Sequence, residues 1–430
     1  MNDQAAFCRH LAEQAPPGPL LLALSGGLDS SLLLHLLVQA GLAPRLAVVH
    51  VDHQLQDQSG DWARFCQRQV EEYGVPFALA QVCVDPAEGL EAGARDARYG
   101  ALLPMASARQ ATLVTAHHRD DQAETLLFRL LRGAGVQGLS AMRERSGREG
   151  VPLWRPLLAI GRPTLESWAE ESGIQWQEDP SNGDQHHRRN YLRHRIVPAL
   201  RERWPGADAT LSRTAEHMAE AAELLEEVAK ADAVEAGVQG AVFPLEGLAA
   251  LTTARQRNLL RWWLVGLGAG APSAAVLEQI RLLQAALEDS QGKVEWGDNA
   301  LRLYRGALYF GHRSHFAPWQ GEAVWHEGAL PPDIPNWQWS KEQSHHAIAV
   351  LRPPGDLTVQ PLLGAMTLRR NGMHQLIKEL WRAAGVPPWQ RRQWPLLCRD
   401  GAVLSVPGCG LADGLSVEQA QQWFLTPATP

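Results

Sequence analysis

The first 130 residues alternate between short apolar runs and stretches in which apolar residues recur at helical spacing. The runs are rich in leucine and valine, which is typical of strands that are buried on both faces. The stretch SSLLLHLLVQA (30–40) has the spacing of a helix. The predicted strands are PLLLALS (19–25), RLAVVHVDH (45–53), PFALAQVCV (76–84) and ATLVTAHH (111–118). This alternation predicts an α/β fold with a doubly wound parallel sheet.

The remaining segments differ in composition. Residues 133–205 are rich in arginine, glycine and proline, and we expect loops and short helices there, at the rim of a first domain (1–205). Residues 206–335 are predicted to form a mainly helical central domain for substrate recognition. A proline- and tryptophan-rich stretch, roughly 316–336, is predicted to be a linker. Residues 345–425 are predicted to form a small α+β C-terminal domain.

Composition and charge narrow the class of protein. The 430 residues carry a formal net charge of -7, so a site for a polyanion must be a local basic patch. The five cysteines are scattered and form no CxxC pair, which predicts neither a disulfide framework nor a zinc site. The N-terminal stretch has no signal-peptide pattern, and no apolar run is long enough to span a bilayer. We therefore expect a cytoplasmic protein with no membrane contact.

Polar clusters follow three of the predicted strands: SGGLDS (25–30), VDH (51–53) and AHHRDD (116–121). Ligands of such sheets bind outside the carboxyl ends of the strands, so these clusters should share one edge. In SGGLDS, glycines let backbone amides approach an anion at a helix N-terminus, which predicts a phosphate loop. The lysine of a Walker loop and the spacing of a dinucleotide fingerprint are both missing. A plain strand–turn–helix with a serine cap is the alternative.

Asp29 is unusual beside a phosphate loop, because a carboxylate repels phosphate unless a cation lies between them. Mg²⁺ is the cation that such carboxylates and substrate phosphates usually share, so Asp29 is a candidate Mg²⁺ ligand. An aspartate in a surface turn is the alternative interpretation.

SGGLDS resembles the SGGxDS signature of the PP-loop, or N-type, ATP pyrophosphatases. The resemblance implies that ATP is cleaved between its α and β phosphates, that an oxygen is activated as an adenylate, and that the loop holds the pyrophosphate. The residues implied at the nucleotide are Ser25, Gly26, Gly27, Leu28, Asp29, Ser30, His53 and His117. A histidine at a strand end, such as His117 or His118, is about as often hydrogen-bonded only to its protein neighbours as it is in contact with a ligand.

Further stretches resemble the tRNA(Ile)-lysidine synthase family. They include VDHQLQ (51–56), ARDARYGALL (94–103), the block from 115 to 142, and the block from 155 to 200 with EDPSNGDQHHRRNYLRHR. The likeness covers residues 20–205 almost continuously and resumes at 368–397. One departure is His53-Gln54-Leu55, where the family usually has His-Gly-Leu. The resemblance implies that ATP and Mg²⁺ are used to attach free L-lysine to carbon 2 of the wobble cytidine, in the isoleucine tRNA with a CAU anticodon.

Asp121 and Glu124 lie three residues apart on a predicted helix and therefore share a face. By resemblance, Asp121 joins Asp29 at the metal and the reacting groups, and both Asp121 and Glu124 bind the substrate lysine. Two acids that merely stabilise the helix dipole are the alternative. Arg95 and Arg98 are candidates to neutralise phosphate oxygens in the transition state. Their alternative is salt bridging to nearby acids.

Two basic regions are candidate tRNA contacts. The first holds Arg189, Asn190 and Arg193, for which a solvated basic helix start is the alternative. The second interleaves tryptophans with basic residues near the C-terminus, which suits RNA phosphates and an exposed base. A basic surface around a tryptophan core is its alternative. The second set is Arg369, Arg370, Lys378, Arg391 and Arg392.

Two other functions stay open from the sequence. Another PP-loop enzyme is one, although a thiolation enzyme usually needs paired cysteines and an amidotransferase needs a glutaminase. A module that binds ATP or RNA without catalysis is the other, but it has little need for the three carboxylates. The lysidine synthase family often pairs, which leaves a homodimer open.

Overall fold

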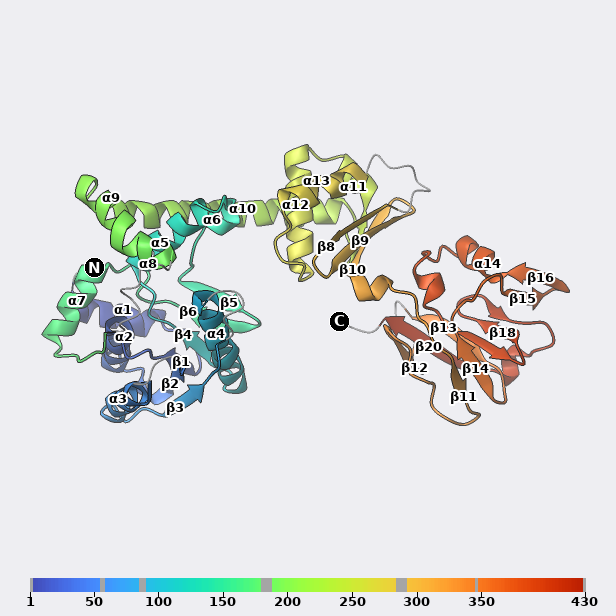
Figure 1. Cartoon of the computed structure of the whole chain (residues 1–430), viewed down its shortest axis with the longest axis horizontal. Helices are drawn as coiled ribbons and strands as arrows, with labels where there is room; N and C mark the ends of the chain where they lie inside the picture. Colours follow the sequence, from blue (N-terminus) through green and yellow to red (C-terminus); the bar gives the residue numbers. More distant parts are fainter. Residues whose placement is uncertain are drawn as a thin grey trace. The chain divides into compact units, whose positions relative to one another are not determined.

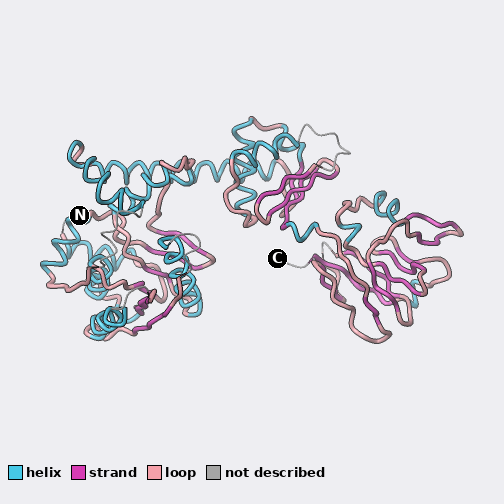
Figure 2. Tube along the Cα trace, in the orientation of Figure 1, coloured by secondary structure: helices cyan, strands magenta, loops and turns pink. Residues whose placement is uncertain are grey.

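The computed structural model describes residues 3–54, 59–84, 90–178, 188–283, 292–344 and 347–427. The chain folds into two compact units, Met1–Leu225 and Glu226–Pro430, each of which is considered by itself (Figure 1). Helices and strands alternate in the first unit, whereas the end of the second unit is mostly strands and loops (Figure 2). No described helix combines the length and apolar composition needed to cross a membrane.

The first unit follows the predicted alternation of strands and helices. Its strands are β1 (Leu20–Ala23), β2 (Leu46–Asp52), β3 (Phe77–Gln81), β4 (Thr112–Val114), β5 (Arg145–Arg148) and β6 (Val151–Trp154). Its longer helices are α1 (Gln4–Gln14), α2 (Leu28–Gln39), α3 (Ser59–Glu71), α4 (Leu90–Ala108), α5 (Arg119–Leu130), α7 (Arg162–Glu171) and α10 (Ala207–Glu235), which continues into the second unit. Short helical segments are α6 (Val136–Leu139), α8 (Arg188–Tyr191), a π-helical turn (Leu192–Ile196) and α9 (Val197–Arg203).

The sheet runs in the order β3-β2-β1-β4-β6-β5, and all pairs are parallel except β5 with β6. Alternate residues of one strand face opposite sides: Leu20 and Leu22 pack with α1, α2 and α7, whereas Leu21 packs with α4. The sheet is therefore covered on both faces, which confirms the doubly wound fold. The chain order reverses between β1 and β4, so the loops that follow these two strands flank the switch point where such folds bind ligands.

The arginine-rich segment after residue 133 contains more than the predicted loops and short helices. β6 extends the parallel sheet beside β4, and β5 returns antiparallel at its edge. A two-residue turn joins them, with positive φ at both Glu149 (51°) and Gly150 (80°). Trp154 on β6 is fully buried in the core. The expectation for this segment was wrong at these positions, because the hairpin is short and lacks the usual turn signal.

The second unit begins with helices packed on a small antiparallel sheet. The sheet order is β7-β10-β9-β8, and Phe243, Trp263 and Leu308 are buried between the layers. The elements are β7 (Val242–Pro244), α11 (Leu245–Ala249), α12 (Thr253–Gly266), α13 (Ala274–Leu283), β8 (Lys293–Trp296), β9 (Asn299–Tyr304) and β10 (Ala307–His312). The helices predicted for this region are present, and the structure adds these four strands to them.

In the described residues of the C-terminal part of the second unit, the strands form two sheets beside one α-helix. They comprise β11 (Ala323–Trp325), β12 (Trp337–Ser340), β13 (Ile348–Arg352), β14 (Leu357–Gln360), β15 (Thr367–Arg370), β16 (Met373–Leu376), α14 (Ile377–Ala383), β17 (Leu396–Arg399), β18 (Ala402–Val406), β19 (Gly410–Leu411) and β20 (Gln421–Pro427). The predicted linker is only partly a connector. β11 lies within it and pairs with β14, and Trp325 is fully buried in the core of this sheet.

Candidate active site

The phosphate loop connects β1 to α2 and is held by its own hydroxyl groups. Ser30 Oγ accepts the backbone N–H of Ser25 at 3.1 Å and lies 2.9 Å from Ser25 Oγ. Gly26 has a φ of +79°, and an added Cβ would clash with Trp62 and Cys66. Gly27 caps α2 without a side-chain hydrogen bond. The first amides of α2 therefore lack a side-chain acceptor, as an anion site requires.

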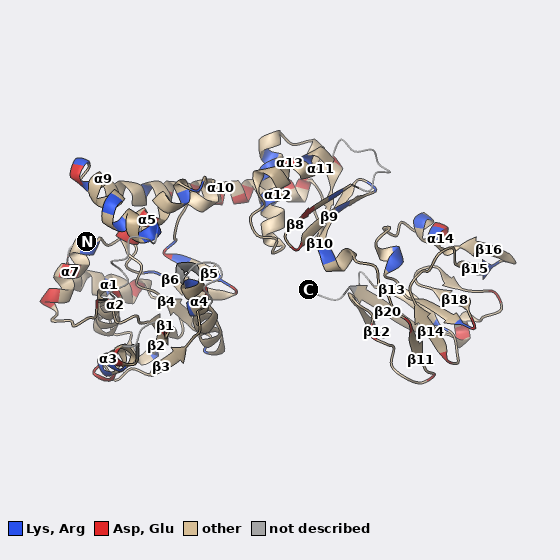
Figure 3. Cartoon of the chain, in the orientation of Figure 1, with Lys and Arg blue, Asp and Glu red and all other residues tan. Residues whose placement is uncertain are grey.

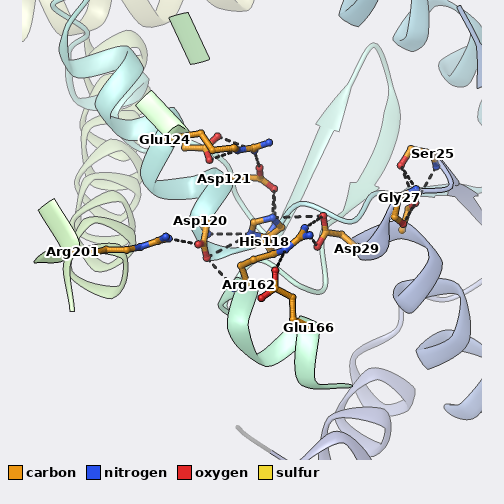
Figure 4. A network of polar contacts seen from close by, with 12 residues as sticks. Ser25, Gly27, Asp29, His118, Asp120, Asp121, Glu124, Arg162, Glu166 and Arg201 are labelled. Carbon is orange, nitrogen blue, oxygen red and sulfur yellow. Dashed lines mark hydrogen bonds and ion pairs between the residues drawn. The ribbon is translucent and has the colours of Figure 1, made fainter. Parts of the chain in front are cut away.

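Asp29 projects from the first turn of α2 toward α7 and α5 (Figure 4). Both of its carboxylate oxygens accept Nη1 of Arg162 at 2.8 Å, and its Oδ2 lies 3.8 Å from His118 Nε2. Burial raises the pKa of Asp29, while His118 and Arg162 act in the opposite direction. Arg162 was not singled out from the sequence. Its only sequence signal is Gly161-Arg162-Pro163, which marks the start of a helix.

The start of α5 carries the acidic residues that the sequence predicted, and they share one face. Glu124 is 2% exposed, and its carboxylate accepts Nε of Arg193 at 2.7 Å and Nη2 at 3.0 Å. The same Nη2 donates to Asp121 Oδ1 at 2.9 Å. Burial raises the pKa of Glu124, although Arg193 opposes the shift. Arg193 comes from the π-helical turn, so a segment far along the chain closes this acidic face.

Asp120, which was not predicted as a site residue, ties three segments together. It forms an ion pair with Arg201 of α9, accepts the backbone N–H of Arg162 at 3.0 Å, and lies 3.7 Å from His118 Nδ1 (Figure 4). Burial would raise the pKa of Asp120, but the nearby His118 and the backbone N–H of Arg162 hold it well below its ordinary value. Asp120 thus fixes where α7 and α9 meet the start of α5.

The two neighbouring histidines after β4 have different surroundings. His118 Nε2 lies between Asp29 Oδ2 (3.8 Å) and Asp121 Oδ2 (3.5 Å). Burial would lower the pKa of His118, but Asp121, Asp120 and Asp29 together raise it to about 9. Burial lowers the pKa of His117 to about 3, and its Nδ1 lies 2.9 Å from Thr115 Oγ1. His118 therefore lies among the acidic residues, and the nucleotide contact predicted for His117 stays a prediction.

The other predicted nucleotide and catalytic residues come from α2, from α4 and from the end of β2. Arg95 and Arg98 both approach the ring of Tyr99, at 5.9 Å and 5.7 Å from its centroid. Burial lowers the pKa of Arg98, and the charge of Asp121 acts against that shift. His53 follows β2 directly. Leu28 is buried in the core, so any ligand contact it makes is through its backbone.

The departure from the family pattern falls where the backbone has a special conformation. Gln54 has a φ of +53°, in the region that favours glycine, and its N–H donates to Asp52 Oδ1 at 2.8 Å. The side-chain hydrogen bond compensates part of the strain that a non-glycine residue brings to this conformation. Leu55 and Gln56 of the quoted motif, and residues 179–187 of the basic block, lie outside the described residues.

The predicted tRNA residues have different exposure. Arg189 on α8 donates to Thr125 Oγ1 at 2.7 Å, and Asn190 follows it on the same helix. Figure 3 shows basic residues along α14, where Lys378 is exposed. Arg369, Arg370 and Arg392 are also exposed.

Arg391 is the buried member of the predicted set, and its tRNA contact stays a prediction. It is 7% exposed, donates from Nε to the Val386 carbonyl at 2.7 Å, and donates from Nη2 to the Tyr304 hydroxyl at 3.1 Å. Both of these hydrogen bonds are made within the second unit.

Comparisons with known proteins show which family the chain resembles along its length. The PP-loop domain family matches residues 2–200, the TilS substrate binding domain matches 243–309, and the TilS substrate C-terminal domain matches 357–426. A tRNA(Ile)-lysidine synthase of Pseudomonas syringae pv. tomato is 38% identical over 94% of this chain and 91% of its own length. One from Alkalilimnicola ehrlichii is 38% identical over 94% of this chain and 93% of its own length.

The chain belongs to the tRNA(Ile)-lysidine synthase family. It is accordingly an ATP-using ligase built on a PP-loop domain, and the family carries out the lysidine-forming modification of tRNA. Among solved structures, a tRNA thiolase from Methanococcus maripaludis is 17% identical, with a TM-score of 0.43, over 50% of this chain and 78% of that chain.

Proposed function

We propose that this chain ligates free L-lysine to carbon 2 of the wobble cytidine in the isoleucine tRNA with a CAU anticodon. The observation that carries the proposal is the buried carboxylate of Glu124, which binds the cationic side chain of Arg193. Arg193 also binds Asp121, which lies with Asp29 of the phosphate loop around His118. A site that pairs a buried carboxylate with a cation is suited to the ammonium group of a lysine. The alternative of an ATP-holding module without catalysis gives no reason for this carboxylate.

The reaction divides into two steps. First, the oxygen on carbon 2 of the cytidine attacks the α-phosphate of ATP, forming an adenylated cytidine and releasing pyrophosphate. The loop from Ser25 to Ser30 and the first amides of α2 hold the departing pyrophosphate. Next, the lysine ε-amine, after losing a proton, attacks carbon 2 and AMP leaves. Arg95 and Arg98 balance the charge that gathers on the α-phosphate.

Asp29 and Asp121 fit the donor set of a Mg²⁺ ion. Their oxygens converge on one point, since both lie within 3.8 Å of His118 Nε2. Within the described residues, no group of three or more acidic, histidine or cysteine side chains could hold a metal. Two carboxylates suit Mg²⁺, which takes most of its ligands from phosphates and water. When bound, the ion would neutralise phosphate charge.

The product gives the tRNA a new identity. A lysidine at the wobble position pairs with A rather than G, so codon reading changes from AUG to AUA and charging changes from methionine to isoleucine. In this proposal, Arg189, Asn190 and Arg193 contact the tRNA near the reacting base, and exposed residues of the second unit contact its backbone. The division into a catalytic region (1–205), a central region (206–335) and a C-terminal region (345–425) is part of the proposal, with the three family matches in its support. A cytoplasmic location and a homodimer are also part of the proposal.

Incubation of the unmodified tRNA with ATP, Mg²⁺ and labelled lysine tests the proposal, with nucleoside mass spectrometry as readout. Label in lysidine is expected, and folded protein that transfers none would refute the proposal. Asp29→Asn should reduce turnover by at least about 10³-fold, which corresponds to about 4 kcal/mol of lost charge stabilisation. The affinity for tRNA should stay within about twofold of wild type, because Asp29 faces Arg162 and His118. Glu166→Gln is the matched control, since Glu166 is the other partner of Arg162 and is half-exposed.

A further inference from the structure

Arg193 occupies the site that the proposed function gives to the substrate lysine. Its guanidinium covers both oxygens of Glu124 and one oxygen of Asp121, with donor–acceptor distances of 2.7–3.0 Å. A lysine ammonium would need the same oxygens. The substrate can therefore reach Glu124 only when Arg193 moves away, so the two cations compete.

The competition follows from the burial of Glu124. With 2% of its surface exposed, this carboxylate would be left as an uncompensated buried charge if Arg193 simply departed. Replacing the guanidinium by an ammonium keeps the charge compensated. Arg193 is thus an internal stand-in for the substrate cation, and it keeps the acidic site stable while no substrate is bound.

The segment that carries Arg193 is suited to movement toward an RNA. The Arg193 side chain is 36% exposed, and the residue lies in a π-helical turn, an irregularity that is frequent at functional sites. Three further arginines lie within five residues of it: Arg188, Arg189 and Arg195. This density of guanidinium groups suits a phosphate backbone, which offers Arg193 an alternative anionic partner.

We propose that Arg193 is the gate of the lysine site, and that tRNA opens it by drawing the guanidinium onto an RNA phosphate. The inference rests on the proposed function, because it takes Glu124 as the lysine ligand. Lysine binding and tRNA binding are then positively coupled, and the coupling is reciprocal. In the absence of tRNA, the closed gate keeps lysine away from bound ATP until the wobble cytidine is present.

The test is calorimetric titration of L-lysine into the full chain, with and without saturating CAU-anticodon tRNA, in the absence of ATP. Wild type should bind lysine about 10-fold more tightly with tRNA, within the usual range of coupling between sites. Arg193→Gln should bind lysine about 10-fold more tightly than wild type without tRNA, and tRNA should add nothing. Arg203→Gln, which removes an exposed arginine of α9, is the control and should behave like wild type.

Arg193→Lys supplies a second variant that retains a positive charge for the buried carboxylates. A lysine side chain lacks the planar fork that covers both oxygens of Glu124, so the lysine affinity without tRNA should rise by a few fold. Unchanged lysine affinity on adding tRNA to wild type, or weaker lysine binding by both Arg193 variants, would overturn the gate. Absence of lysine binding in every state, including with tRNA, would instead refute the proposed function itself.

Discussion

Replacing Gly26 with alanine tests whether the phosphate loop depends on its close packing as well as on its backbone angles. Gly26 and Gly41 have nearly the same conformation, with φ values of +79° and +75°. An alanine in the left-handed region costs about 1–2 kcal/mol, and reduced freedom of the unfolded chain offsets about 0.4–1 kcal/mol of that. Gly41→Ala meets open space and should therefore cost only about 1 kcal/mol.

At Gly26 the added methyl group also meets Trp62 and Cys66. The indole of Trp62 donates to the Ser25 carbonyl at 2.6 Å and Cys66 is fully buried, so neither can easily give way. Such overpacking costs about 1–3 kcal/mol, and Gly26→Ala should lose about 2 kcal/mol more than Gly41→Ala.

Hydrogen exchange of the β1 and α2 amides measures this difference as a free energy of opening, and ATP titration measures the effect on the loop. Gly26→Ala should also bind ATP more weakly, whereas Gly41→Ala should not. Equal losses of stability in the two variants would show that the contact with Trp62 is unimportant and that only the backbone angle matters.

Three further predictions concern single side chains. Arg391→Ala should destabilise the second unit by about 2–3 kcal/mol, because it leaves the buried Val386 carbonyl without the Arg391 donor, whereas Arg392→Ala should leave urea unfolding unchanged. Because Arg392 is exposed, Arg392→Ala should instead reduce the slope of log tRNA affinity against log salt concentration by about 1. An unchanged slope would show that Arg392 does not contact the tRNA. Burial lowers the pKa of His50, against the opposing effect of its bond to the Leu24 carbonyl. Its contribution to stability should be complete above pH ~6.5 and be lost as the pH falls further, so wild type should lose more stability than His50→Gln between pH 7.5 and 5.5 in urea unfolding.

The sequence predicted the elements whose signals are local. β1 to β4 are apolar runs between turn residues, and each was recognised from that pattern alone. The hairpin of β5 and β6 was missed because its strands are four residues each, with arginines at both ends of β5. Its turn uses Glu149 where asparagine or aspartate is the common signal. β11 was missed because Trp325 stands in a proline-rich stretch, and only the distant strand β14 gives that tryptophan a core to join.

In the active site, the acidic residues could be predicted and their partners could not. Asp121 and Glu124 share a helix face, so their proximity follows from spacing along the chain. Arg193 and Arg162 reach the acids from 69 to 133 residues away, and no local pattern records such contacts. His117 and His118 are adjacent and chemically identical in the sequence. Only the direction of the chain at the start of α5 decides which one faces the carboxylates.

The acidic centre is assembled with its counter-charges already in place. Each acid of the α2–α5 edge meets an arginine from the segment after residue 161: Asp29 with Arg162, Asp120 with Arg201, and Asp121 and Glu124 with Arg193. Burying these carboxylates is therefore compensated during folding, before any substrate arrives. A cationic substrate or metal ion that enters exchanges with an arginine, so its affinity reflects the difference between two cations. Free lysine should then bind weakly to the chain alone, and the arginines that it displaces become available to the phosphates of the RNA.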